Sequence, residues 1–358
     1  LRRCLKRPGL TDKGFAQIVQ HVRDANDLVE VVAEHVALKR SGRGFVGLCP
    51  FHQEKTPSFH VNPEGFFKCF GCGAGGDVFK FIQRTMGVEF REALELLARR
   101  ASIDLDRYRA RPTGGGPSRT EIYRANAWAA EVFRRDLWQG EPGAQARAYL
   151  IRRKLGEPIV KEFGLGFAAS DGRTLLQRAG RAGIAPSLLS AAGLVVSRQG
   201  EFQDLFRRRL IFPIVDATGN VEAFGGRTLG DDQPKYLNSP ETPVFRKSKS
   251  FFGLYPGRKD IQSSGRVVIV EGYTDCLAAH AAGIRNVVAT LGTALTEEHV
   301  AILRRYAEEI VLVFDGDEAA LRAGDRALGL FLTMGVDLKL ATLPEGQDPC
   351  DFVIEKGG

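Results

Sequence analysis

Four side chains suited to binding a soft metal ion lie in two short pairs. Cys49 and His52 form the first pair, and Cys69 and Cys72 form the second. Two residues separate the members of each pair, a spacing that lets both side chains turn toward one ion. Four such ligands form the closed tetrahedral set of a structural Zn²⁺ site. We therefore predict one structural zinc ion, and we prefer it to a disulfide framework because no secretory signal is evident.

Acidic side chains follow apolar runs in the last hundred residues. Glu271 follows the run 267–270, and Asp315 and Asp317 follow the run 310–314. If these runs are strands of an open α/β sheet, their carboxyl ends form its ligand crevice. Clustered carboxylates repel one another unless a cation lies between them. Oxygen ligands of this kind indicate Mg²⁺ or Mn²⁺ that takes part in phosphate chemistry.

Further acids could support this metal site. Asp275 lies four residues after Glu271, and Asp348 and Asp351 lie near the end of the chain. A single Asp after a strand is often only a turn residue or a helix N-cap. Three acidic motifs at successive strand ends are more typical of a metal site.

The distribution of charge divides the chain into a basic and an acidic part. The 358 residues include 50 Lys and Arg and 43 Asp and Glu, a net charge of +7. From residue 265 onward there are 8 basic and 15 acidic residues, which leaves 42 and 28 in the part before. This division suggests that one part binds a polyanion and the other binds metal ions. A GC-rich genome is the alternative explanation for the excess of arginine.

The composition is that of an ordinary globular protein, with 44% hydrophobic and 26% charged residues. No apolar run of 18 residues occurs, so we expect no membrane span. The basic residues 1–7 are not followed by an apolar region, so we expect no signal peptide. We therefore expect a cytoplasmic protein.

Short elements are expected around the zinc ligands. Apolar spacing predicts a helical stretch over 16–38 and a helix over 90–101, and we expect Asp77 to begin another helix. Strand alternation places Phe66 and Phe67 on opposite faces, one in the core and one on the surface. Short aromatic runs separated by Pro and Gly predict strands at 45–48, 58–61 and 65–70.

Beyond residue 118 the pattern predicts a helix over 119–138 and a basic, β-rich stretch over 205–253. The last part then alternates between strands and helices, which is typical of a parallel sheet covered on both faces. The expected strands lie at 267–270, 286–289, 310–314 and 337–341. The expected helices lie at 274–283, 296–307 and 318–334.

The acidic motifs resemble those of a Toprim domain, the metal-binding catalytic fold of topoisomerases, some nucleases and bacterial primases. The similarity rests on residues 271–275, on 314–317 and on the pair Asp348-Pro349. The resemblance implies that Glu271, Asp315 and Asp317 bind the catalytic Mg²⁺ or Mn²⁺. Asp275 and Asp348 would support them.

Other segments resemble the bacterial replicative DNA primase of the DnaG type. The segments 206–214, 224–227 and 234–242 are similar to its RNA-polymerase core, and 49–52 and 54–59 to its zinc part. The family's basic ridge, which faces template and nucleotide phosphates, would consist here of Arg209, Arg227, Lys235, Tyr236, Asn238 and Lys247. The zinc part would recognise the template and regulate initiation.

The resemblance implies a multidomain fold of the α+β and α/β classes. We expect a zinc-ribbon domain at 14–108, a Gly- and Pro-rich linker at 109–118, a basic α+β subdomain at 119–264 and a Toprim parallel-sheet domain at 265–358. One motif departs from the family, because Cys350 stands where Asp is usual and Asp351 follows it. A thiol is a poor Mg²⁺ ligand, so Asp351 is the candidate replacement.

The resemblance implies a nucleotidyltransferase of the primosome, a DNA-directed RNA polymerase that makes short primers on single-stranded DNA from NTPs. Two alternatives stay open: a Toprim strand-cutting enzyme, and a non-catalytic zinc-dependent DNA-binding or recombination protein. The expected protein is a monomer. A replicative helicase is the family's partner, and we expect its binding domain to lie outside this chain, which ends where the family continues.

Overall fold

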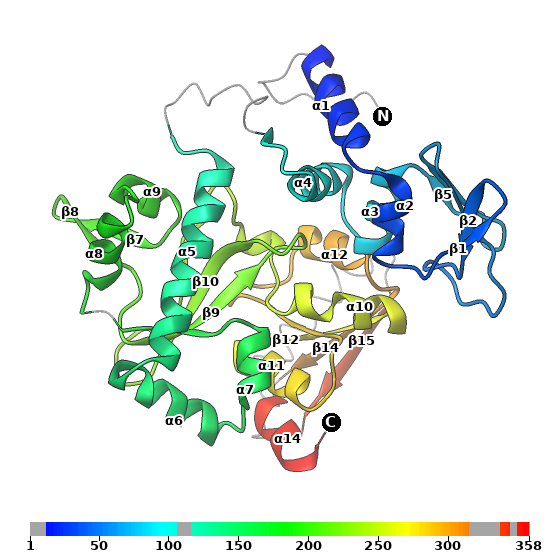
Figure 1. Cartoon of the computed structure of the whole chain (residues 1–358). Helices are drawn as coiled ribbons and strands as arrows, with labels where there is room; N and C mark the ends of the chain where they lie inside the picture. Colours follow the sequence, from blue (N-terminus) through cyan, green and yellow to red (C-terminus); the bar gives the residue numbers. More distant parts are fainter. Residues whose placement is uncertain (1–11, 106–115, 170, 315–336, 344–348, 358) are drawn as a thin grey trace. The chain divides into compact units, whose positions relative to one another are not determined.

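The structure is a computed structural model in which the chain divides into two compact units, Leu1–Ser118 and Arg119–Gly358 (Figure 1). It describes residues 12–105, 116–169, 171–314, 337–343 and 349–357. Each unit has its own sheets and its own core. The limits of the four expected segments stay a prediction.

The first unit begins with two helices where one helical stretch was expected. α1 (Asp12–Asp24) and α2 (Leu28–Ala33) are separated by a short turn. Asp27 ends the continuity because its side chain accepts the Glu30 N–H and caps α2. The prediction of one stretch over 16–38 is therefore wrong at this turn.

The zinc-ligand region folds as a five-stranded antiparallel sheet with strands in sequence order. Hairpin connections join neighbours, so strands close in sequence pair directly. The strands are β1 (Lys39–Ser41), β2 (Gly44–Gly47), β3 (Phe59–Asn62), β4 (Phe66–Cys69) and β5 (Gly75–Gly76). The three expected strands are confirmed within one or two residues.

Aromatic side chains form the core beneath this sheet. Phe59, Phe67 and Phe81 are fully buried and pack ring against ring. Phe66 is 50% exposed, which confirms that it and Phe67 lie on opposite faces. Such rings contribute a large share of the apolar area that a small domain can bury.

Two further helices complete the first unit, and both confirm the sequence expectation. α3 (Val78–Met86) begins after Asp77, whose carboxylate accepts the Lys80 N–H at 3.0 Å. α4 (Phe90–Arg100) follows and buries its apolar face.

The second unit contains a four-stranded antiparallel sheet of order β11-β10-β9-β6. Its strands are β6 (Gly166–Ala168), β9 (Arg209–Val215), β10 (Val221–Thr228) and β11 (Tyr236–Asn238). The long helix α5 (Arg119–Trp138) packs against β6 and β10 and has the predicted bounds.

Short elements surround this sheet. Besides the 3₁₀ turn η2 (Glu141–Gly143), they are α6 (Ala144–Arg152), α7 (Glu157–Glu162), α8 (Thr174–Arg181), α9 (Pro186–Ala191) and the hairpin of β7 (Val195–Arg198) and β8 (Glu201–Asp204).

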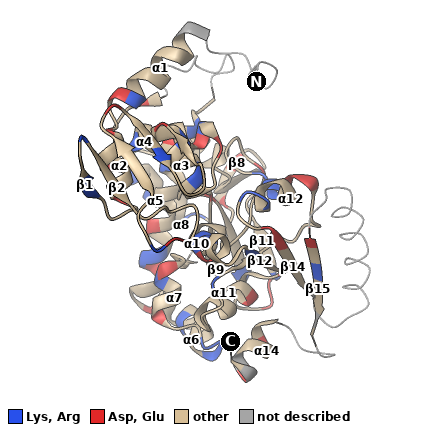
Figure 2. Ribbon diagram, turned by 90° about the vertical axis from the view of Figure 1, so that its right-hand side faces the viewer, with Lys and Arg blue, Asp and Glu red and all other residues tan. Residues whose placement is uncertain are grey.

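A parallel sheet of order β13-β12-β14-β15 forms the rest of the second unit. β12 (Arg266–Val270), β14 (Glu309–Phe314) and β15 (Asp337–Thr342) lie side by side (Figures 1 and 2), and β13 (Val287–Ala289) is at one edge. The neighbouring helices are α10 (Leu254–Ser264), α11 (Tyr273–Ala281), α12 (Glu297–Leu303) and α14 (Pro349–Lys356). The expected strands are confirmed.

The helix expected over 296–307 is shorter, because α12 ends at Leu303. The helix expected over 318–334 lies outside the described residues. Among the helices that the structure describes, none is long and apolar enough to cross a membrane.

One hydrophobic core connects the antiparallel and the parallel sheet. Phe212 of β9 stacks on Tyr273 of α11 at 4.9 Å between ring centroids, and Phe252 meets the same Tyr273 ring edge-on at 5.0 Å. Cys276 is fully buried in this cluster, where it packs as a small core residue. The shared core fixes the position of β12 relative to β9 and β10.

Candidate functional site

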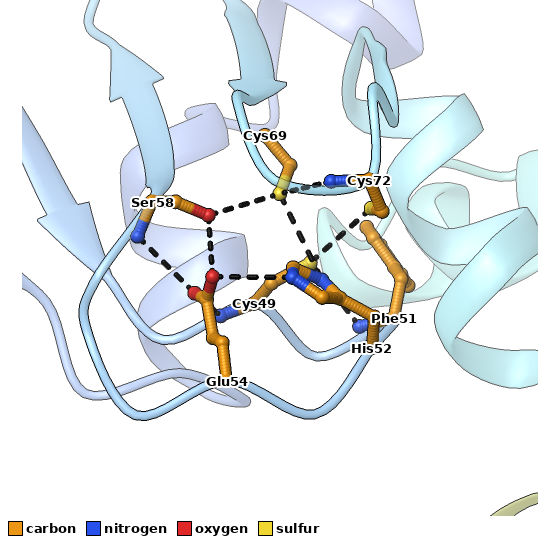
Figure 3. A network of polar contacts seen from close by, with 7 residues as sticks. All are labelled: Cys49, Phe51, His52, Glu54, Ser58, Cys69 and Cys72. Atoms are coloured by element: carbon orange, nitrogen blue, oxygen red, sulfur yellow. Dashed lines mark hydrogen bonds and ion pairs between the residues drawn. The ribbon is translucent and has the colours of Figure 1, made fainter.

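The four predicted zinc ligands lie together at one end of the small sheet (Figure 3). Their ligand atoms are all within 4.8 Å of one another. The Sγ atoms of Cys49 and Cys72 are 3.9 Å apart, and the same distance separates Cys69 Sγ from His52 Nδ1. Tetrahedral Zn²⁺ with bonds of about 2.3 Å to sulfur keeps its ligand atoms roughly 3.8 Å apart. The residues therefore fit a zinc ion.

Local backbone geometry explains how the ligand pairs converge. The Phe51 and Cys72 N–H groups each donate to the thiol of the preceding cysteine ligand, Cys49 and Cys69, at 3.4 Å. A Cβ at Gly71 would lie 2.6 Å from His52 Nε2, so only glycine allows the two knuckles to approach this closely.

The environment of the thiols favours a bound cation. Burial raises the pKa of the Cys49 thiol. Burial acts in the same direction on Cys69, but the contacts of its sulfur with the Ser58 hydroxyl and the Cys72 N–H lower its pKa. A metal ion removes the cost of burying such thiolates.

The carboxyl ends of the parallel strands β12 and β14 lie at the same end of the sheet. β12 and β14 are adjacent, and Ile269 pairs with Leu312. Glu271 follows β12 directly and is exposed, and β14 ends at Phe314. Asp315, Asp317 and Asp348 lie outside the described residues. In the part of the sheet that the structure describes, Glu271 therefore lies at the end of the strands where β14 also ends.

Asp275 is buried in the first turn of α11. Its carboxylate accepts the Gly272 N–H at 3.0 Å, which holds the turn between β12 and the helix. Asn238 bridges the two sheets, because it accepts the Tyr273 hydroxyl at 2.7 Å and donates to the Leu291 carbonyl at 2.8 Å. Both residues orient the backbone beside Glu271.

A basic pocket of about 510 Å³ opens beside the antiparallel sheet. Basic side chains from the end of α6 and from β10 and the loop after it line its wall, and the positions on α6 are blue in Figure 2. Its lining residues are Tyr149, Arg152, Arg153, Arg227, Thr228, Leu229, Gly230, Asp231, Gln233 and Lys235.

Arg227 is held against two aromatic rings in this pocket. Its guanidinium carbon lies 4.3 Å from the ring centre of Tyr149 and 5.9 Å from that of Tyr236. Two buried polar atoms at this point, Arg227 Nε and the Tyr149 hydroxyl, have no hydrogen-bond partner among the described residues. Burial raises the pKa of Tyr149, so its hydroxyl stays protonated and can donate. Such donors suit an anionic ligand.

Arg209 does not lie on an exposed ridge, contrary to the expectation. It is 5% exposed, and its Nη1 donates to the carbonyls of Gly226 and Lys235 at 3.1 and 3.3 Å. Its position at the start of the central strand β9 explains the burial, because neighbouring strands cover both sides. Arg209 supports the backbone that carries Lys235. Lys247 begins the 3₁₀ turn η3 (Lys247–Lys249) and does not line the pocket.

The sequence analysis did not identify Tyr149, Arg152 and Arg153 as part of this site. The available signal was the run of basic residues 152–154, which begins three residues after Tyr149. Arg153 also contacts the last helix, because its Nη1 lies 3.1 Å from Asp351 Oδ1 and 3.8 Å from the buried Cys350 Sγ. Asp351 is thus placed beside a cation of the pocket.

Three family models match successive parts of the chain. They describe a CHC2 zinc finger over residues 15–112, the N-terminal domain of the DNA primase catalytic core over 132–258 and a Toprim-like domain over 268–353. They confirm the expected fold class. They also agree with the expected cofactors, a structural Zn²⁺ and a catalytic Mg²⁺.

Curated relatives named DNA primase are similar along nearly the whole chain. The relative from Clostridium acetobutylicum is 41% identical over 342 residues, which cover 95% of this chain and 57% of the relative. The relative from Halalkalibacterium halodurans is 40% identical over 344 residues, with the same two coverages of 95% and 57%. The chain thus spans little more than half the length of these relatives.

Solved structures of primases have the same fold. The zinc-binding and RNA polymerase domains of the Aquifex aeolicus primase match with a TM-score of 0.63 and 34% identity, over 95% of this chain and 82% of that one. A DnaG primase catalytic domain bound to ssDNA matches with a TM-score of 0.63 and 37% identity, over 67% and 78%. At these identities and coverages, the chain belongs to the family of bacterial DnaG-type primases.

Proposed function

We propose that the chain is a DNA-dependent RNA polymerase that synthesises short RNA primers on single-stranded DNA during replication. The observation that carries the proposal is the basic pocket, where buried donors of Arg227 and Tyr149 have no partner among the described residues. Burying a donor without a hydrogen-bond partner costs free energy. A hydrogen bond to an anionic oxygen of a ligand offsets this cost. Phosphate oxygens of a template or a nucleotide are such anions. Membership of the primase family supports the reaction.

The acids at the strand ends are proposed to hold the catalytic metal. Glu271, Asp315 and Asp317 would bind Mg²⁺, with Asp275 and Asp348 in support. When bound, Mg²⁺ neutralises triphosphate charge and activates the 3′-hydroxyl of the primer. The task of the protein is then to hold the nucleotide phosphates in place by electrostatic contacts, and no side-chain nucleophile is required.

The ligands of the basic pocket are proposed to be the DNA template and NTPs. Arg227 and Lys235 would contact phosphates, with Arg153 as a further cation at the wall. The solved DnaG catalytic domain bound to ssDNA supports the template as ligand. Tyr236, Asn238, Lys247 and Arg209 would position the backbone around them.

The remaining assignments are proposals for the whole protein. We propose the domain limits 14–108, 119–264 and 265–358, with a linker at 109–118, and a role of the zinc unit in template recognition. We further propose that the protein is a cytoplasmic monomer. A replicative helicase is the partner that the family implies.

The test is incorporation of labelled NTPs on a single-stranded DNA template with Mg²⁺. We expect Glu271→Gln to lower the rate by about 100-fold or more, because it removes charge that holds the metal. The control is Glu308→Gln, which makes the same change just before β14 begins. This residue lies at the amino-terminal end of the strand, whereas Glu271 follows the carboxyl end of β12. Equal rates for both variants would remove Glu271 from the metal site.

The same preparation separates the two alternatives. A strand-cutting enzyme would nick or relax supercoiled DNA and incorporate no NTP. A non-catalytic DNA-binding protein would retain template without incorporating or cutting. Primer synthesis without cleavage is the result that the proposed function requires.

A further inference from the structure

Glu54 is a nearly buried carboxylate beside the zinc ligands. Its side chain is 9% exposed. It accepts the N–H of Cys49 at 2.7 Å and, at 3.1 and 2.5 Å, the N–H and the hydroxyl of Ser58 (Figure 3). The spacing of the zinc ligands does not predict these contacts. All of them are made by the carboxylate of Glu54.

The ring of His52 lies between this carboxylate and the thiols. Its Nε2 is 3.2 Å from Glu54 Oε2, and its Nδ1 is 3.9 Å from Cys69 Sγ. A neutral imidazole has one donor and one acceptor nitrogen, and a carboxylate only accepts. The proton therefore belongs on Nε2, which leaves the lone pair of Nδ1 directed at the thiols.

We propose that Glu54 selects Nδ1 of His52 as the zinc-binding atom and acts as a positioning residue for both ligand pairs. Ligating histidines commonly donate their second ring N–H to a carboxylate, which fixes the tautomer and the ring orientation. Here the same carboxylate also holds the backbone of Cys49. Glu54 thus orients two of the four ligands directly.

Ser58 extends this contact to the second ligand pair. Its hydroxyl oxygen lies 2.5 Å from Glu54 and 3.3 Å from Cys69 Sγ. Gly71 leaves room for this arrangement, because a Cβ there would lie 2.9 Å from the Ser58 oxygen. One carboxylate therefore connects ligands that are separated by the whole β3–β4 hairpin.

The first test measures zinc affinity in the full chain by competition with a chromogenic chelator. We expect Glu54→Ala to weaken zinc binding about 10- to 100-fold, the range found when such partners of metal ligands are removed. Glu54→Gln keeps the shape and an acceptor oxygen, so its loss should be smaller. The matched control is Glu64→Gln in the β3–β4 turn, where the exposed carboxylate contacts Asn62. Affinity of both Glu54 variants within twofold of this control would overturn the proposal.

The second test uses the unmutated chain, so it does not depend on how a variant folds. The chain is labelled with ¹⁵N-histidine and loaded with ¹¹³Cd²⁺ in place of zinc. We expect scalar coupling of the metal to Nδ1 of His52 and a proton on Nε2. Coupling to Nε2 would contradict the assignment.

Discussion

At the scale of single residues, Arg227 is a cation of the pocket that lies against two aromatic rings. Its guanidinium packs 4.3 Å from the Tyr149 ring centre, and its buried Nε has no partner in the described chain. We expect Arg227→Ala to weaken binding of single-stranded DNA. Loss of one phosphate contact should lower the slope of log K against log salt by roughly 0.7. Fluorescence anisotropy over a salt series measures both quantities.

Two further variants separate the effect of the charge of Arg227 from the effect of its stacking and serve as controls. Arg227→Lys keeps the charge and should keep the slope, but it loses the planar stacking on Tyr149 and should bind more weakly. Arg181→Ala removes an exposed cation at the end of α8, outside the pocket lining, and should change little. An unchanged slope for Arg227→Ala would mean that Arg227 contacts no phosphate and has a structural role instead.

Ligand spacing predicted the zinc residues because both members of each pair are local in sequence. The position of Arg209 could not be predicted, since its burial depends on which strands flank β9. Arg153 and Glu54 were missed for the same reason. Their partners lie in other segments of the chain. The residue type alone, basic or acidic, does not show what the side chain contacts after folding.

At the scale of elements, α14 contacts the basic pocket through Asp351. The carboxylate pairs with Arg153 at 3.1 Å and is 63% exposed. We expect Asp351→Asn to leave the Mg²⁺ requirement of primer synthesis unchanged, because the acid faces a cation here. An exposed pair of this kind contributes at most about 1 kcal/mol. A titration with Mg²⁺ distinguishes an ion-pair partner of Arg153 from a supporting metal ligand. A marked rise in the Mg²⁺ requirement of the variant would show that Asp351 is a supporting metal ligand.

Helix α11 is tied to β13 by a buried histidine. His280 is 2% exposed, and its Nε2 lies 2.8 Å from the Val287 carbonyl. Burial lowers its pKa, so the unfolded chain binds this proton more readily than the folded one. Stability should therefore decrease as the pH falls below about 6.5 toward the lower pKa of the folded state, by at most about 1.4 kcal/mol per pH unit.

Urea unfolding at pH 7, 6 and 5 tests this dependence. His280→Gln lacks the titrating ring and should lose less stability over this interval than the unmutated chain. The carboxylates whose pKa is lowered by ion pairs, such as Glu162 and Glu309, act only at more acidic pH. Identical pH dependence of the two proteins would show that His280 does not contribute.

Element types were largely predictable, since apolar periodicity is local. The parallel strands and the helix 119–138 illustrate this. The break between α1 and α2 was missed because the cap at Asp27 interrupts an otherwise continuous apolar pattern. The sheet order β13-β12-β14-β15 depends on long-range pairing, which no window of sequence contains.

At the scale of the whole molecule, the two units differ in what stabilises them. The unit Leu1–Ser118 combines a core rich in aromatic rings with the zinc site, whereas the described part of Arg119–Gly358 contains extended hydrophobic clusters. Metal binding contributes directly to the stability of a small domain, because the unfolded chain does not offer the assembled ligands. The second unit contains extended cores, and the zinc ligands are not part of it.

Removal of zinc should therefore unfold the first unit and leave the second one folded. We expect a zinc-selective chelator to abolish hydrogen-exchange protection in β2, β3 and β4, while β9, β10 and β12 stay protected. Cys69→Ala should give the same pattern without chelator. Chelator already saturated with zinc is the control, and it should change nothing. Loss of protection in both units at once would mean that their folding is coupled, because the zinc ligands belong to the first unit alone.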